Sequence, residues 1–232
     1  MKTQRTIFLG LITIFFIVPF SAAQVNYSWV GGSGNNWSEM ANWSPAGVPG
    51  MSDTAIITLE GDYNVILDLD ATVAKIVLGG ATGAQTLTLS SRTLTMNDDI
   101  EIGSNGVLSI TGSTISGTGL IRNLGSLQST SGLFNIGIVN YGLSTFTGTN
   151  ELTDTIITHA NSTLNLVSSG PLNFRSDKGF ENNGLMQCLT YNYWGGGSVE
   201  VTNGSLVNNA GGVLNIRVMA ALSSSSSPLN FV

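Results

Sequence analysis

The residues best suited to chemistry in this 232-residue chain are its scattered carboxylates. Asp68 and Asp70 lie two positions apart, and on a β-strand such residues point to the same side. Retaining glycosidases hold their two carboxyl groups about 5–5.5 Å apart and inverting ones about 6.5–9.5 Å, which same-face neighbours can match. Asp68 and Asp70 are therefore the candidate catalytic pair. The competing interpretation is that they are solvated acids at corners of the chain.

Two further groups of charged residues are weaker candidates. The pair Asp98-Asp99 precedes Glu101, but adjacent aspartates between apolar residues are typical of a turn. Asp177 lies beside the basic residues Arg175 and Lys178. Neither group has a spacing that predicts a particular reaction.

The chain contains one histidine, His159, and one cysteine, Cys188. Asp154 is near His159 in the sequence, but a catalytic triad also needs a positioned nucleophile, and no such pattern accompanies the pair. A surface or turn histidine is therefore favoured. One His and one Cys cannot complete a usual zinc site, and Cys188 is expected to be a small buried hydrophobe. The sequence predicts neither a metal site nor a cofactor.

An aromatic cluster is the stronger candidate for binding. Tyr191, Tyr193 and Trp194 precede three glycines in an irregular interval between expected strands. Loops carry binding more often than the framework does, and aromatic faces suit the apolar faces of sugar rings. We expect Tyr191, Tyr193 and Trp194 to contact a glycan, and binding to weaken when Tyr193 or Trp194 is replaced by alanine.

The N-terminal residues have the features of a targeting segment. Lys2 and Arg5 precede an apolar run that extends to Phe20, and Ser21-Ala22-Ala23 follows. A basic region, an apolar region and a small-x-small cleavage site together indicate a secretory signal peptide over residues 1–23. We therefore expect a secreted protein, extracellular or on the outer cell surface. Cleavage removes two cations and no acid, which moves the net charge from -6 to -8.

Charge and hydropathy narrow the set of partners. Only 9% of the residues are charged, against about 25% in ordinary soluble proteins. A nucleic-acid partner is excluded because neutralising phosphates requires clustered cations. No transmembrane span is expected after signal cleavage, since no later apolar run approaches the roughly 20 residues needed. Extracellular glycans or cell-surface components are the expected partners.

The elements that must position these residues are short β-strands. Apolar and polar residues alternate with period two, which is typical of half-buried strands. Leu87-Thr88-Leu89 and Leu108-Ser109-Ile110 are examples, and Gly, Asn and Ser separate such segments. A pattern with helical periodicity is nearly absent. The sequence therefore predicts an all-β protein.

The turns between these strands recur with a period near 20. A small residue, preceded by Asn and followed by an apolar residue, marks each repeat; the markers are Gly106, Gly125, Gly142, Ser162, Gly184 and Gly204. Such a period indicates an architecture in which each unit packs only against its neighbours. We predict a right-handed parallel β-helix (β-solenoid) with the marker glycines stacked at equivalent corners. The alternative is a β-sandwich, which would scatter them among unrelated loops.

Three of the four tryptophans lie near the start of the expected mature chain. Trp29, Trp37 and Trp43 are accompanied by Gly31, Gly32 and Gly34. Aromatic side chains bury about 150–250 Å² each, enough to cover the open end of a solenoid core. We expect a buried aromatic cap; the alternative is an exposed sugar-stacking platform with the three indoles in one plane.

This segment also carries a resemblance. The pattern W-x-G-G-x-G-N-N-W, then N-W-S, then P-G-x-x-D-x-A-x-I over residues 29–57 resembles the opening segment of secreted bacterial β-helix surface proteins, including large adhesins and autotransporter-like passengers. The resemblance implies an architecture and a location, and no reaction.

The expected organisation has three parts. Residues 1–23 form the signal peptide, residues 24–58 the Trp/Gly-rich cap segment and residues 59–232 the solenoid repeats, which we expect to be truncated at the C-terminus. The expected function is structural or adhesive, without catalysis. The alternatives are the N-terminal part of a β-helix polysaccharide lyase or glycoside hydrolase, or a carbohydrate-binding module.

Overall fold

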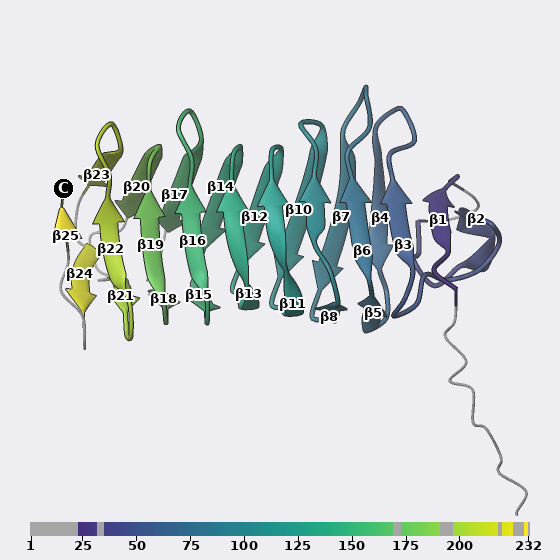
Figure 1. The fold of residues 1–232 in the computed structure, drawn as a ribbon, viewed down its shortest axis with the longest axis horizontal. Coiled ribbons are helices and arrows are strands. Elements are labelled where there is room, and N and C mark those ends of the chain that lie inside the picture. Colours follow the sequence, from purple (N-terminus) through teal and green to yellow (C-terminus); the bar gives the residue numbers. More distant parts are fainter. Residues whose placement is uncertain are drawn as a thin grey trace, which may run out of the picture.

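The chain folds into a rod of stacked β-coils (Figure 1). The structure, a computed structural model, describes residues 23–31, 35–168, 173–190, 197–217, 220–224 and 230–231. Within them the only helical segment is the 3-10 turn η1, Met40–Asn42. None of these residues form a helix long and apolar enough to cross a membrane. The prediction of an all-β protein is confirmed.

Each coil contributes strands to three faces. Face 1 is an eight-stranded parallel sheet that consists of β4 (Tyr63–Leu67), β7 (Gln85–Ser90), β10 (Gly106–Thr111), β12 (Ser126–Thr130), β14 (Leu143–Thr147), β17 (Thr163–Ser168), β20 (Leu185–Thr190) and β23 (Val213–Arg217). The chain then turns into a second, larger sheet, which bends to form the other two faces.

Faces 2 and 3 share the long strands β11 (Thr114–Asn123) and β13 (Leu133–Asn140), which run through the corner between them. The other strands of face 2 are β5 (Ala71–Val73), β8 (Thr93–Met96), β15 (Thr149–Leu152), β18 (Asn173–Ser176), β21 (Gly197–Val201) and β24 (Ala220–Ser224). Face 3 also contains β1 (Asn26–Trp29), β3 (Thr54–Ile57), β6 (Lys75–Leu78), β9 (Ile100–Ile102), β16 (Thr155–Thr158), β19 (Gly179–Asn182), β22 (Ser205–Asn208) and β25 (Asn230–Phe231).

Successive coils pair in parallel, which decides between the two predicted architectures. In Figure 1 the strands of face 3 rise in front, the chain crosses to face 1 behind, and the rod advances as a right-handed coil. The only antiparallel pair among the described strands joins β1 to β2 (Trp43–Ser44). A β-sandwich is built from antiparallel sheets, so the β-solenoid prediction is confirmed. Face 1 registers give coils of 17 residues (Ser126 to Leu143) up to 28 (Leu185 to Val213), with an average near 21.

The marker glycines confirm the stacking, with one correction. Gly125 lies against the backbone of Gly106, and Gly142 lies against that of Gly125, at the corner that leads into face 1. Gly184 continues this line, next to Ser162. Gly204 does not, because it precedes β22 of face 3 and lies against Lys178. The next position in the line is Gly212, which directly precedes β23.

Trp29, Trp37 and Trp43 form a buried cap at the N-terminal end of the rod. Their exposed fractions are 3%, 0% and 2%, and β1 and β2 lie at that end in Figure 1. Trp43 meets Trp29 and Trp37 edge-on, with ring centroids 5.1 and 4.8 Å apart. The prediction of an aromatic cap is confirmed, and a platform of three coplanar exposed indoles is excluded.

The interior changes character along the rod. The early coils are filled by aliphatic side chains, such as Leu78 and Ile102 at the end of face 3. From β11 onward the same inward position holds polar side chains, namely Asn123, Asn140, Thr158, Asn182 and Asn208. We call these residues the amide ladder. The side-chain amide of Asn123 donates to Oδ1 of Asn140 over 3.0 Å, and that of Asn182 donates to Oδ1 of Asn208 over 2.7 Å.

Candidate functional site

The candidate catalytic pair, Asp68 and Asp70, lies at a corner of the first coil. β4 ends at Leu67 and β5 begins at Ala71, so neither aspartate is on a strand, and the expectation of a shared strand face is wrong. The Asp68 carboxylate accepts hydrogen bonds from the backbone N–H and the hydroxyl of Ser38. The Asp70 carboxylate accepts the backbone N–H of Thr93 over 2.8 Å. Each aspartate therefore holds a different segment of the chain.

The environment of Asp68 favours its ionised form. Burial raises the pKa of this carboxyl, but the hydrogen bonds from Ser38 and the positive charge of Arg92 lower it by more, so its pKa falls below the usual value. A general acid for glycoside cleavage needs the opposite shift, because it must keep its proton near neutral pH. Asp68 is therefore suited to joining segments of the backbone.

Other aspartates perform the same structural task. The carboxylates of Asp53, Asp62 and Asp99 accept backbone N–H groups 21 to 28 residues away in the sequence, from Val25, Ala84 and Leu120. A carboxylate that accepts a backbone N–H forms one of the stronger hydrogen bonds in proteins. These aspartates, which lie between strands, are thus clamps that join segments distant in the sequence.

A cluster of four charged residues lies on the outer side of face 3. It consists of Lys75, Asp99, Glu101 and Arg122, and we call it the charged cluster. Lys75 Nζ lies 2.7 Å from Glu101 Oε1, and Arg122 Nε donates to Asp99 Oδ2. Burial raises the pKa of Asp99, but the hydrogen bonds from Arg122 and Leu120 lower it by more, so its pKa is below the usual value.

This shift predicts a dependence of stability on pH. Because the pKa of Asp99 is lower in the folded state than its ordinary value of 3.8, ionised Asp99 stabilises the fold above that pH, and the contribution is lost as the pH falls below it. We expect Asp99→Asn to lower stability at pH 7 and to flatten the stability profile below about pH 4. Urea unfolding followed by circular dichroism at a series of pH values measures both effects. If the variant lost stability below about pH 4 as steeply as the wild type, the proposed contribution of ionised Asp99 would be contradicted.

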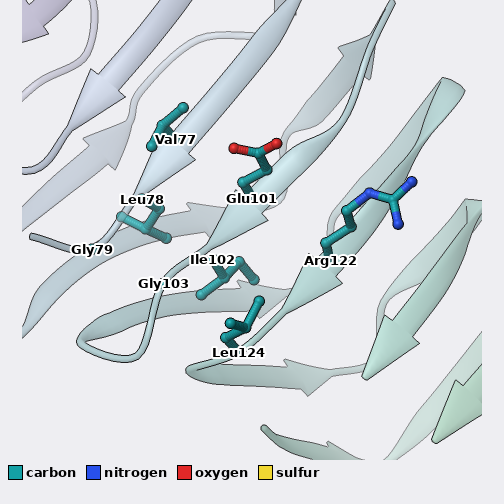
Figure 2. A pocket seen from close by; sticks show the side chains of 8 residues that line it. All are labelled: Val77, Leu78, Gly79, Glu101, Ile102, Gly103, Arg122 and Leu124. Atoms are coloured by element: carbon teal, nitrogen blue, oxygen red, sulfur yellow. The ribbon is translucent and has the colours of Figure 1, made fainter. Parts of the chain in front are cut away.

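Two residues of the charged cluster, Glu101 and Arg122, line a hollow of about 310 Å³ together with Val77, Leu78, Gly79, Ile102, Gly103 and Leu124. Figure 2 shows Glu101 and Arg122 extending outward from neighbouring strands, Leu124 at one edge, and Gly79 and Gly103 without side chains below them. We call this feature the charged hollow. Leu124 is 56% exposed. The hollow thus combines a carboxylate, a guanidinium and an apolar edge on one shallow surface.

The chain was compared with protein-family models, with curated proteins and with solved structures. No match was found. The geometry of the described residues therefore carries the functional argument.

His159 and Cys188 are placed away from any catalytic arrangement. His159 stacks on Tyr141, with ring centroids 4.1 Å apart, whereas Asp154 pairs with Lys178 Nζ over 3.0 Å. Cys188 is fully buried in face 1, and burial raises the pKa of its thiol to about 12. Within the described ranges no group of three or more His, Cys, Asp or Glu side chains could hold a metal ion.

The candidate glycan contacts Tyr191, Tyr193 and Trp194 lie outside the described residues. The charged hollow was not predicted as a site. Glu101 was noted in the sequence only beside a turn, and its approach to Arg122 depends on the register between β9 and β11. No short motif encodes this register.

The outer side of face 1 presents a second regular surface. One column of outward residues, which we call the polar column, is uncharged in every described coil from β7 to β23: Thr88, Ser109, Gln128, Thr145, Asn165, Gln187 and Asn215. Neighbouring strands lie about 4.8 Å apart, so hydroxyl and amide groups repeat at that spacing along the rod. This surface offers hydrogen-bond donors and acceptors without charge.

Proposed function

We propose that this protein is a secreted or cell-surface β-solenoid with a structural and adhesive role and no catalytic activity. The observation that carries the proposal is that five aspartate carboxylates form structural hydrogen bonds with the backbone. Asp53, Asp62, Asp68, Asp70 and Asp99 all accept backbone N–H groups from segments distant in the sequence. Groups that would otherwise supply acid–base chemistry are committed to holding the rod together.

The polar column supports the adhesive part of the proposal. Hydroxyl and amide side chains match the hydrogen-bonding groups of neutral glycans, and the column extends along face 1 from β7 to β23. Weak contacts that repeat along a rigid rod add up when a ligand also repeats, because each further contact is then intramolecular. A polymer or a coated surface therefore fits this protein better than a single small substrate.

Activity assays on the secreted chain test the proposal. We expect no release of reducing sugar and no unsaturated product from a panel of neutral and acidic polysaccharides, with or without Ca²⁺. We also expect the chain to bind at least one glycan-coated surface.

Asp68→Asn, Asp70→Asn and Asp62→Asn form the matched set, because all three carboxylates clamp backbone N–H groups. Turnover that disappears in the variants at residues 68 or 70 but persists in Asp62→Asn would establish an enzyme and overturn the proposal. If the chain binds none of the coated surfaces, the adhesive part of the proposal is contradicted.

A further inference from the structure

Two glycines of one column at the end of face 3 line the charged hollow. Backbone hydrogen bonds place Gly79, Gly103, Leu124, Tyr141 and His159 one above the other along the rod. The first two positions carry no side chain. At Gly79, which has φ +107°, a Cβ would lie 2.6 Å from a backbone nitrogen, so only glycine fits there. The floor of the hollow therefore includes bare backbone at Gly79 and Gly103, next to the side chains of Val77, Leu78 and Ile102.

Polar atoms at the wall of the hollow have unused hydrogen-bonding capacity. Of the two carboxylate oxygens of Glu101, Lys75 bonds Oε1, and of the three guanidinium nitrogens of Arg122, Nε donates to Asp99. In the described part of the chain, Oε2 of Glu101 and the two terminal amino groups of Arg122 have no partner. Although Glu101 and Arg122 are directly opposite in the register, they form no ion pair with each other. An acceptor and a set of donors thus face solvent beside the same floor.

The charges around the hollow determine which ligand fits. Lys75 and Arg122 contribute two positive charges, and Asp98, Asp99 and Glu101 contribute three negative ones. The net negative charge disfavours carboxylated or sulfated sugars, whereas the guanidinium at the wall disfavours amines and metal cations. A neutral ligand with adjacent hydroxyl groups can bond both charged groups, since one hydroxyl donates to the Glu101 carboxylate and another accepts from the Arg122 guanidinium.

Size and shape agree with a sugar ring. The volume of about 310 Å³ is at the lower end for small-ligand sites, and exposed Leu124 provides an apolar contact for the C–H face of the ring. We propose that the charged hollow binds one pyranose ring of a neutral glycan. This inference rests on the adhesive function proposed above and names the class of ligand for one position on the rod.

Titration of the secreted chain with simple glycosides tests the inference. The probes are methyl β-D-glucopyranoside, methyl β-D-galactopyranoside and methyl α-D-mannopyranoside, with galacturonate and glucosamine as charged comparisons. We expect at least one neutral glycoside to give saturable NMR shifts of the Glu101, Arg122 and Leu124 amides, with a dissociation constant in the millimolar range. The charged sugars should bind more weakly. Absence of saturable shifts with all three neutral probes, or tighter binding of a charged sugar, would overturn the inference.

Matched variants locate the binding. Glu101→Gln should weaken it about tenfold, because a hydrogen bond to a charged acceptor is lost, and Leu124→Ala several-fold. Gly103→Ala should also weaken binding, by adding a methyl group to the floor. Glu181→Gln is the control, since Glu181 occupies the same outward column of face 3 away from the hollow. An equal loss in Glu181→Gln would show a general charge effect and contradict the site.

Binding of the same variants to glycan-coated surfaces separates the two proposals. If the wild-type chain binds a surface and Glu101→Gln and Leu124→Ala bind it equally well, the inference about the hollow fails and the adhesive function remains. If the wild-type chain binds no surface but its hollow binds a glycoside, the adhesive function fails and the site remains.

Discussion

Replacing Trp37 with alanine should lower the free energy of unfolding by about 3–5 kcal/mol, the usual cost of truncating a buried large aromatic residue. Trp37 is fully buried, its ring lies edge-on against Trp43, and its backbone carbonyl accepts the indole N–H of Trp43 over 2.8 Å. Truncation leaves a cavity at the end of the core, where only one neighbouring coil can close it. Urea unfolding monitored by circular dichroism measures the loss.

Tyr141→Ala provides the control for this experiment. Tyr141 is also a large aromatic residue, but it is 44% exposed on the outside of the rod. Its truncation should change the unfolding free energy by less than about 1 kcal/mol. Equal losses in the two variants, or a loss below about 1 kcal/mol for Trp37→Ala, would show that the tryptophan cluster does not close the core.

Asn140→Ala should cost about 2–4 kcal/mol, because it removes the centre of a buried hydrogen-bond network. Oδ1 of Asn140 accepts from Asn123 over 3.0 Å and from the hydroxyl of Ser144 over 2.9 Å. Its amide donates to the carbonyl of Thr163 over 2.9 Å, which joins face 3 to the start of face 1 in the next coil. The variant removes all three of these hydrogen bonds from the interior, although Asn123 keeps its bonds to the carbonyl of Leu143 and the hydroxyl of Ser144. Chemical unfolding again gives the value.

The matched control for this variant lies on the same strand. Asn135 is on β13 like Asn140, but it is exposed and points outward. Asn135→Ala should stay within about 0.5 kcal/mol of the wild type. If Asn140→Ala changed the unfolding free energy as little as Asn135→Ala does, the hydrogen bonds of the amide ladder would not contribute to stability.

Local patterns in the sequence predicted much of the fold. Leu87 and Leu89 are fully buried and Thr88 points outward, as the period-two alternation required. The tryptophan cap was also predictable, because three large aromatics near one end of a repeat array have few other places to be buried. These predictions depend on neighbours within a few residues.

Features that depend on the length of a coil were not predictable. The marker Gly204 has the right residue type and spacing but belongs to another corner, because the coil that begins at Leu185 is 28 residues long and the corner falls at Gly212. Asp68 and Asp70 have strand-like spacing but follow a strand that ends at Leu67. The charged hollow requires Glu101 to face Arg122, a register that is set by the whole coil between them.

The parallel stacking of the coils has a mechanical consequence. The hydrogen bonds between coils run along the rod, so a pull on its two ends loads them lengthwise, and the coils can detach one at a time from either end. A coil such as that from Tyr63 to Gln85, 22 residues long, occupies about 4.8 Å of the rod when folded and extends to about 70 Å when pulled straight. Each detached coil therefore lengthens the tether more than tenfold over its folded height, and the coils beyond it keep their structure.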